Sequence, residues 1–468
     1  MATKKPKPKP HLEAEYCKGC GRCIEACRFN CIEMGTEIHP ETGLVPVLFN
    51  LDDCTACGLC FSACPEPYGL SGEIIDADFE LLDPEKMFGD RKTDAPKPVT
   101  IPDEMVPVPA VGPLVTKGTY ASAIGALFAG CRHFFGYPIT PSTEGAELMA
   151  KILPKMEGVF LQAISEVATV NMMYGCGGAG MPCMTFTSSP GFSLMLEGLS
   201  YLIGAEVPCV FVNVMRGGPG LGNIAPEQAD IKLVCRGLGH GNTHAIVLAP
   251  STPQEMLDVT IKAFELSFKY RNPVIIIGDG YLGQMTGNVQ LPTEMKKPGI
   301  PDWAVYGDEM HRGNLISSIY LSEQDLEKHN EHLIRKYNEI KANEQWVDLF
   351  ECDDAEVLLV ACNTPSRMAK GAVEELRAQG IKAGLFRPIT VWPFPVDELK
   401  KQLGHVDKIV VVEASEGQLE DEMRLALAHA NVTDVPEIHH VRRYGGVLPQ
   451  MEEIIEKVSA LMGAGVEG

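Results

Sequence analysis

The sequence has no apolar run long enough to cross a membrane. A spanning helix needs roughly 18 or more consecutive apolar residues, and no stretch of the chain reaches that length. The N-terminus also lacks the apolar segment of a secretory signal. We therefore expect no membrane partner and no export. Sixteen cysteines in a chain without such a leader are typical of a protein of the reducing cytoplasm.

Positive charge is also scarce, since the formal net charge is −22. Binding to nucleic acid needs a concentrated positive surface, so we expect no nucleic-acid partner. The one basic cluster lies in residues 1–10, where proline and lysine alternate and cannot build a core. A disordered tail is the prediction, and a weak docking segment is the alternative.

A length of 468 residues favours about three domains. Composition and pattern divide the chain into six segments. They are a basic tail (1–10), a cysteine-rich module (11–83), a Pro-rich linker (84–117), an α/β domain (118–290), a connecting segment with a charged helix (291–352) and a second α/β domain (353–468).

Eight cysteines of the module form two nearly identical runs. The first run, C-x2-C-x2-C-x3-C, starts at Cys17, and the second starts at Cys54 and is followed by Pro65. This spacing lets one loop hold three corners of an iron–sulfur cube, while the fourth cysteine reaches the other cluster. The prediction is one [4Fe–4S] cluster on Cys17, Cys20, Cys23 and Cys64, and another on Cys54, Cys57, Cys60 and Cys27.

Zinc or disulfides are the alternatives for these cysteines, but zinc sites use pairs of Cys or His rather than repeated triplets. The first run departs from the bacterial pattern, because Arg28 and not proline follows Cys27. Cys31 lies close behind and is either a spare thiol or a rival fourth ligand. The spacing favours Cys27, and the doubled runs indicate that the chain carries electrons.

From residue 118 onward, short apolar runs alternate with helical patterns. Pro182–Thr187 and Pro208–Val214 are typical of buried parallel strands, and Pro253–Tyr270 is typical of an intervening helix. This rhythm predicts a doubly wound α/β domain. A second α/β unit begins at Glu356–Ala361.

The segment Gly136–Glu144 lies where a strand ends and a helix begins. Two prolines, Thr140 and Ser142 make a stiff turn that presents hydroxyl groups at the carboxyl end of the sheet. This edge is where open α/β sheets bind ligands.

The turn resembles the YPITPS turn of the α subunit of 2-oxoacid:ferredoxin oxidoreductases. Four further motifs follow in the family's order: Ser165-Glu166, Thr185–Gly191, Arg216–Gly220 and Arg387–Pro395. The resemblance covers about residues 112–460. It implies a thiamine-diphosphate-dependent enzyme that converts a 2-oxoacid and coenzyme A into acyl-CoA, CO2 and reduced ferredoxin. The first α/β domain would then be a pyrimidine-binding domain, and the cysteine-rich module a ferredoxin-like α+β domain fused in front of it.

The resemblance assigns roles to individual residues. Glu166 matches the glutamate that hydrogen-bonds the aminopyrimidine of thiamine diphosphate, with a solvated or helix-capping glutamate as the alternative. Thr140 and Arg216 match positions that contact the substrate, and a guanidinium suits a carboxylate. A surface arginine is the alternative for Arg216. Cofactor contacts are expected from Tyr137, Pro138, Ser188 and Ser189.

The chain lacks the complete diphosphate and Mg2+ motif of thiamine enzymes. Gly278-Asp279-Gly280 imitates its start, but no Asn-Asn pair follows, so we expect Asp279 not to bind a metal. The resemblance then implies a β subunit that holds the diphosphate and Mg2+, without which this chain is inactive. It also implies a γ-type subunit, a dimer of such heteromers, and a ferredoxin or another electron acceptor.

The stretch RGGPGLGNIAPEQAD, which starts at Arg216, is more similar to branched-chain (2-oxoisovalerate) or aryl 2-oxoacid enzymes than to pyruvate enzymes. Two alternatives remain: the chain belongs to a 2-oxoglutarate-specific enzyme, or it is a subunit that serves mainly in electron transfer or as a scaffold. Delivery of electrons to NAD through another subunit is equally compatible with the sequence.

Overall fold

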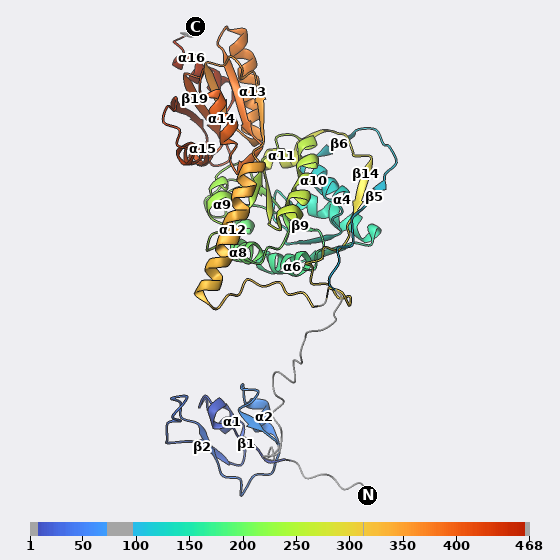
Figure 1. Ribbon diagram of the computed structural model, residues 1–468, viewed down its shortest axis with the longest axis vertical. Helices are drawn as coiled ribbons and strands as arrows, with labels where there is room; N and C mark the ends of the chain where they lie inside the picture. The colour runs from blue at the N-terminus through green and yellow to red at the C-terminus, as the bar shows by residue number, and fades with distance from the viewer. Residues whose placement is uncertain (1–7, 73–96, 312, 464–468) are drawn as a thin grey trace. The chain divides into compact units, whose positions relative to one another are not determined.

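The computed structural model describes residues 8–72, 97–311 and 313–463. The chain divides into two compact units, residues 1–94 and 95–468, and Figure 1 shows the elements of each. The first seven residues of the predicted tail, and residues 84–96 of the predicted linker, lie outside the described residues. None of the described helices has the length and apolar composition that crossing a bilayer requires.

The N-terminal unit is a small α+β module with a duplicated local structure. Its two helices each begin after a left-handed glycine, Gly21 or Gly58, and each ends at the fourth cysteine of its run. The duplication of the cysteine runs is therefore repeated in the backbone. The elements are β1 (His11–Leu12), η1 (Ala14–Tyr16), α1 (Arg22–Ala26), β2 (Ile32–Met34), β3 (Val47–Phe49), α2 (Leu59–Ala63) and β4 (Leu70–Ser71).

The larger unit contains a seven-stranded sheet in the order β18-β11-β12-β10-β9-β7-β8. Six of its strands run parallel, and the central ones are buried throughout. They are β7 (His133–Gly136), β8 (Val159–Gln162), β9 (Cys183–Thr187), β10 (Val210–Met215), β11 (Ile246–Leu248) and β12 (Val274–Asp279).

Helices cover both faces of this sheet, which confirms the predicted doubly wound fold. One group that packs together is α4 (Gly118–Phe128), α5 (Thr143–Ile152), which continues into η2 (Leu153–Met156), and α10 (Pro253–Tyr270). The other group is α6 (Glu166–Gly178), α7 (Ser189–Leu194) and α8 (Leu196–Gly204). Two short helices, α9 (Ile231–Arg236) and α11 (Gly280–Gln284), complete the domain.

The second α/β domain is built on a five-stranded sheet in the order β15-β17-β16-β19-β20. Its strands are β15 (Val347–Phe350), β16 (Val357–Val360), β17 (Ala383–Pro388), β19 (Lys408–Glu413) and β20 (Glu437–Arg442). Its helices are α13 (Asn363–Ala378), α14 (Val396–Gln402), α15 (Gln418–His429) and α16 (Met451–Leu461). The long helix α12 (Glu323–Asn343) leads into this domain and lies beside α8 (Figure 1), where His329 Nε2 hydrogen-bonds the Gly204 carbonyl.

One segment of the second domain joins the first sheet. Strand β18 (Thr390–Trp392) pairs antiparallel with β11 at the sheet edge. Just before it, the buried guanidinium of Arg387 makes two hydrogen bonds to Glu255 of α10, at 2.8 and 2.9 Å. The motif that begins at Arg387 therefore holds the two α/β domains together.

The predicted linker does not extend over residues 104–117. Strands β5 (Glu104–Pro107) and β6 (Leu114–Lys117) pair antiparallel with β14 (Glu294–Lys297) and β13 (Thr286–Val289) of the first α/β domain. Both faces of β5 are largely exposed. The sequence therefore shows no apolar alternation there, and the prolines dominate the pattern.

Candidate active site

The predicted site residues lie at the carboxyl ends of four adjacent strands. Arg216 follows β10, Ser188 and Ser189 follow β9, Thr140 lies in the turn after β7, and Glu166 lies just after β8. These strands are parallel neighbours, so their ends meet at one edge of the sheet. Ligands of open α/β sheets bind at this edge.

Arg216 contacts the turn that carries Thr140. Its Nη1 donates to the Thr140 carbonyl oxygen at 2.6 Å, and its Nη2 donates to the Leu221 carbonyl at 3.2 Å. The side chain is 8% exposed, so Arg216 is not a surface arginine. Its Nε finds no hydrogen-bond partner among the described residues. One donor of a buried guanidinium thus remains for a ligand.

Glu166 is the first residue of α6 and is 5% exposed. Ser165 caps this helix, because its hydroxyl accepts the Ala168 N–H at 3.2 Å, and the cap therefore does not depend on Glu166. Gly191 of α7 faces the carboxylate: a Cβ at this position would lie 2.6 Å from both Glu166 Oε1 and Thr187 Oγ1. Only glycine leaves these two groups in place.

Two buried hydroxyl groups near Glu166 lack partners among the described residues, those of Thr187 and Ser188. Ser189 differs, since its hydroxyl accepts the Arg216 N–H at 3.0 Å. Burying an unpaired hydroxyl is costly, so such groups in a folded protein indicate that a polar partner belongs beside them. Together with the Glu166 carboxylate and Arg216 Nε, they fit a polar cofactor and an anionic substrate.

The predicted residues of the turn after β7 are exposed, unlike Glu166 and Arg216. Tyr137, Pro138 and Thr140 are all exposed, and Thr140 is fixed through its carbonyl group by Arg216. The structure thus joins Thr140, Ser189 and Arg216 by direct hydrogen bonds. It gives Tyr137 and Pro138 no such contact with them.

Asp279, at the end of β12, serves as a junction between the two α/β domains. Its Oδ1 accepts the N–H groups of Tyr281 and Leu282 at the start of α11, at 3.0 and 2.9 Å. Thr364 of α13 donates its N–H and its hydroxyl to the same carboxylate, at 2.9 and 2.8 Å. Burial raises the pKa of Asp279, whereas these donors lower it.

Two acidic residues near Arg216 were not among those predicted from the sequence. Glu227 and Asp230 line a cavity of about 560 Å³ together with Arg216 and Ser189. Burial raises the pKa of Asp230, although Asn213 Nδ2 donates to its Oδ2 at 2.8 Å. No spacing rule could have found these residues, because their position depends on how the loop after Arg216 folds back.

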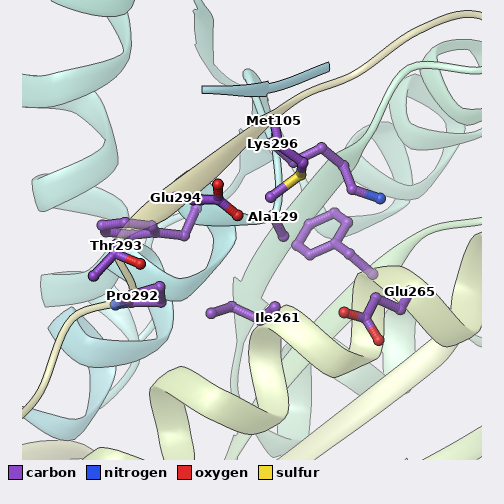
Figure 2. A pocket seen from close by; sticks show the side chains of 10 residues that line it. Met105, Ala129, Ile261, Glu265, Pro292, Thr293, Glu294 and Lys296 are labelled. Carbon is purple, nitrogen blue, oxygen red and sulfur yellow. The ribbon is translucent and has the colours of Figure 1, made fainter. Parts of the chain in front are cut away.

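A separate cavity of about 400 Å³ lies between α4, α10 and strand β14. Figure 2 shows Ile261 and Glu265 of α10 on one side and Pro292, Thr293 and Glu294 on another. None of the predicted site residues lines it. We assign it no part in the chemistry at the sheet edge.

The cysteines of the N-terminal module fall into the two predicted sets. One cavity is lined by Cys17, Cys20, Cys23 and Cys64, and another by Cys27, Cys54, Cys57 and Cys60. Four thiolates around one space are what a [4Fe–4S] cube requires, so these residues fit the clusters. Cys31 also lines the second cavity, but its N–H donates to Cys27 Sγ at 3.3 Å and its thiol to the Phe29 carbonyl at 3.6 Å.

Three family models match the chain. Residues 124–347 match the thiamine-diphosphate-binding domain of pyruvate flavodoxin/ferredoxin oxidoreductase, and residues 355–454 match core domain II of pyruvate:ferredoxin oxidoreductase. Residues 16–67 match a 4Fe-4S dicluster domain.

Several curated relatives match over nearly their whole length, and two of them show the range of their names. The ketoisovalerate oxidoreductase subunit VorB of Methanothermobacter thermautotrophicus is 44% identical, over 75% of this chain and 98% of the relative. The 2-oxoglutarate synthase subunit KorA of Methanocaldococcus jannaschii is 38% identical, over 72% of this chain and 97% of the relative.

A solved structure also matches, that of the 2-oxoglutarate:ferredoxin oxidoreductase from Magnetococcus marinus with 2-oxoglutarate, coenzyme A and succinyl-CoA bound. The TM-score is 0.66 at 26% identity, over 75% of this chain and 65% of the other. This chain thus spans just under two thirds of that protein chain.

Proposed function

Because the chain belongs to the 2-oxoacid:ferredoxin oxidoreductases, we propose that it is the α subunit of an enzyme that oxidises a branched-chain 2-oxoacid to an acyl-CoA. The family, the oxidoreductase activity, the thiamine-diphosphate-binding domain and the iron–sulfur domain predicted from the motifs are confirmed. The relatives are named as subunits of larger enzymes, so the chain works with partner subunits. The substrate, the roles of single residues and the composition of the complex are the proposal.

The loop after Arg216 supports a branched-chain substrate. Residues 217–227 contain no Lys or Arg that could pair with a second carboxylate, and two apolar side chains are exposed there, Leu221 at 81% and Ile224 at 59%. An apolar chain end suits such a surface, because its burial is favourable. The ketoisovalerate relative also matches at higher identity than the 2-oxoglutarate relative. The buried Arg216, whose Nε has no hydrogen-bond partner among the described residues and which begins this loop without other cations, is the observation that carries the proposal.

Each site residue then has a distinct task. Arg216 binds the carboxylate of the 2-oxoacid, because a guanidinium pairs with carboxylates through directed N–H groups. Thr140 offers its hydroxyl from the turn that Arg216 fixes. Glu166 would hold the aminopyrimidine of thiamine diphosphate, and the hydroxyls of Thr187 and Ser188 would meet the same cofactor. When bound, thiamine diphosphate supplies the nucleophilic carbon and the electron sink that oxidative decarboxylation needs.

The released electrons suit the N-terminal module, since iron–sulfur clusters accept them one at a time. Cys17, Cys20, Cys23 and Cys64 would hold one cluster, and Cys54, Cys57, Cys60 and Cys27 the other. Cys31 would support Cys27 through its N–H rather than bind iron.

A β subunit would complete the active site with the diphosphate and Mg2+ site, because Asp279 is engaged in a contact between the α/β domains and no Asn pair follows it. A γ-type subunit and a dimer of these heteromers complete the proposed assembly. Ferredoxin is the proposed electron acceptor and coenzyme A the proposed acyl acceptor, as the bound coenzyme A of the Magnetococcus relative supports.

The test is to purify the complex anaerobically with its partner subunits and to measure acyl-CoA formation from five 2-oxoacids. These are 2-oxoisovalerate, 4-methyl-2-oxopentanoate, phenylpyruvate, pyruvate and 2-oxoglutarate. We expect the highest kcat/KM for one of the first two. A preference for 2-oxoglutarate, which the KorA relative favours, would overturn the substrate assignment.

A further inference from the structure

Arg216 starts a tight hairpin, here called the Arg216 hairpin (residues 216–226). Arg216 pairs with Pro226 across it, the Gly217 N–H donates to the Ala225 carbonyl at 2.9 Å, and the Asn223 N–H donates to the Gly217 carbonyl at 3.0 Å. The carbonyl group of Leu221, which accepts a hydrogen bond from the guanidinium, lies within this hairpin. The position of the Arg216 side chain therefore depends on how the hairpin is closed.

The hairpin is fastened to the second α/β domain at Gly445. The Gly445 carbonyl accepts from Asn223 Nδ2 at 2.9 Å, and the Gly445 N–H donates to Glu227 Oε1 at 3.1 Å. The next residue, Gly446, comes so close that a Cβ there would lie 2.5 Å from the Ala225 Cβ. A turn of the second domain is thus pressed against the far end of the hairpin.

Glu227 links the Arg216 hairpin to the turn at Gly445. Its other oxygen, Oε2, accepts the Gly218 N–H at 2.5 Å, so one carboxylate holds both the hairpin and the turn at Gly445. Glu227 is 7% exposed, and in the described part of the chain no cation pairs with it. A buried carboxylate is costly unless its hydrogen bonds compensate for the lost hydration. The N–H groups of Gly218 and Gly445 can both donate to Glu227 only while the two α/β domains keep this relative position.

We propose that Glu227 is a positioning residue through which the second α/β domain sets the affinity for the 2-oxoacid, by fixing the hairpin that holds Arg216. The inference rests on the proposed role of Arg216 in binding the substrate carboxylate. It gives the second domain, whose Gly445 lines the same cavity as Arg216, a measurable effect on substrate binding.

The test uses two variants of the complex purified with its partner subunits. Glu227→Gln keeps one acceptor oxygen and leaves one N–H group without its partner. Gly446→Ala pushes a methyl group against Ala225 at a backbone φ of +95°. Gly380→Ala is the matched control, because Gly380 also has a positive φ (+83°) in the second domain but nothing within 4 Å of its Cβ position.

For Glu227→Gln we expect the KM for the 2-oxoacid to rise about tenfold, the factor that corresponds to one lost hydrogen bond. For Gly446→Ala we expect a rise of about the same size, because the added methyl group displaces the turn whose Gly445 bonds Asn223 and Glu227. The kcat should stay within about threefold and the KM for coenzyme A should not change. Hydrogen exchange on the full chain should be faster at residues 217–225 in both variants and unchanged in Gly380→Ala. An unchanged KM for the 2-oxoacid in both variants would overturn the inference, as would an equal rise in the KM for coenzyme A.

Arg216→Gln distinguishes failure of this inference from failure of the proposed function. If Arg216→Gln leaves the KM for the 2-oxoacid unchanged, the proposed role of Arg216 is wrong. If Arg216→Gln raises that KM while Glu227→Gln and Gly446→Ala do not, only the role of Glu227 is wrong.

Discussion

Gly191→Ala should damage catalysis without unfolding the protein. The added Cβ would lie 2.6 Å from Glu166 Oε1 and from Thr187 Oγ1. Ordinary contact needs about 3.4 Å, so the carboxylate, the hydroxyl or helix α7 must move by roughly 0.8 Å. A misplacement of about 1 Å at a reacting group can cost roughly 100-fold in rate. We therefore expect kcat to fall about 30- to 100-fold.

The assay is acyl-CoA formation by the complex, under anaerobic conditions and with saturating thiamine diphosphate. Alanine forms helices better than glycine by about 1 kcal/mol, so stability should be nearly unchanged. Gly175→Ala in α6 is the control, because Gly175 has nothing within 4 Å of its Cβ position; it should keep full activity. A folded Gly191→Ala complex with kcat within about threefold of the wild type would refute this account of Glu166.

Three further predictions concern other parts of the chain. Cys64→Ser should lower the iron content from about eight to about four atoms per chain, whereas Cys31→Ser should retain about eight; iron analysis with electron paramagnetic resonance tests this. Burial lowers the pKa of His244 to about 4, whereas in the unfolded chain it is about 6.5. The unfolded state therefore binds a proton more readily, and the free energy of unfolding falls as the pH drops from about 6.5 to about 4. His244→Phe keeps an aromatic ring stacked on Trp392. In urea unfolding, the variant should lose up to about 3 kcal/mol less stability than the wild type over this pH range. An equal loss in both proteins would contradict this prediction. Asp279→Asn should lower the free energy of unfolding by about 1–3 kcal/mol, because fewer of the four groups that donate to Asp279 then find an acceptor. An unchanged urea midpoint would count against the role of Asp279 as a junction between the α/β domains.

Local signals made much of the fold predictable. The helix predicted at Pro253–Tyr270 has those bounds in the structure, because Thr252 caps its start and the left-handed Arg271 ends it. The position of the candidate residues was predictable for a similar reason, because polar residues directly after apolar runs, such as Glu166 and Arg216, lie at the carboxyl edge of a parallel sheet. Their roles came from the resemblance and stay predictions.

Contacts between distant segments were not predictable. Strand β18 pairs with the sheet of the other domain, and β5 pairs with β14 although its own sequence shows no strand pattern. Glu227 and Gly445 are 218 residues apart. Nothing in either local sequence signals the contact, since it arises only when the two α/β domains pack together.

We propose that this chain supplies both the carboxylate that activates the cofactor and the clusters that take the electrons. The most direct measurement is electron paramagnetic resonance of the Glu166→Gln complex, mixed anaerobically either with 2-oxoisovalerate and coenzyme A or with dithionite. We predict that dithionite reduces the clusters as in the wild type, whereas the 2-oxoacid reduces them at least about 100-fold more slowly. Reduction by the 2-oxoacid at the wild-type rate would contradict the claim and would leave the chain as an electron-transferring scaffold.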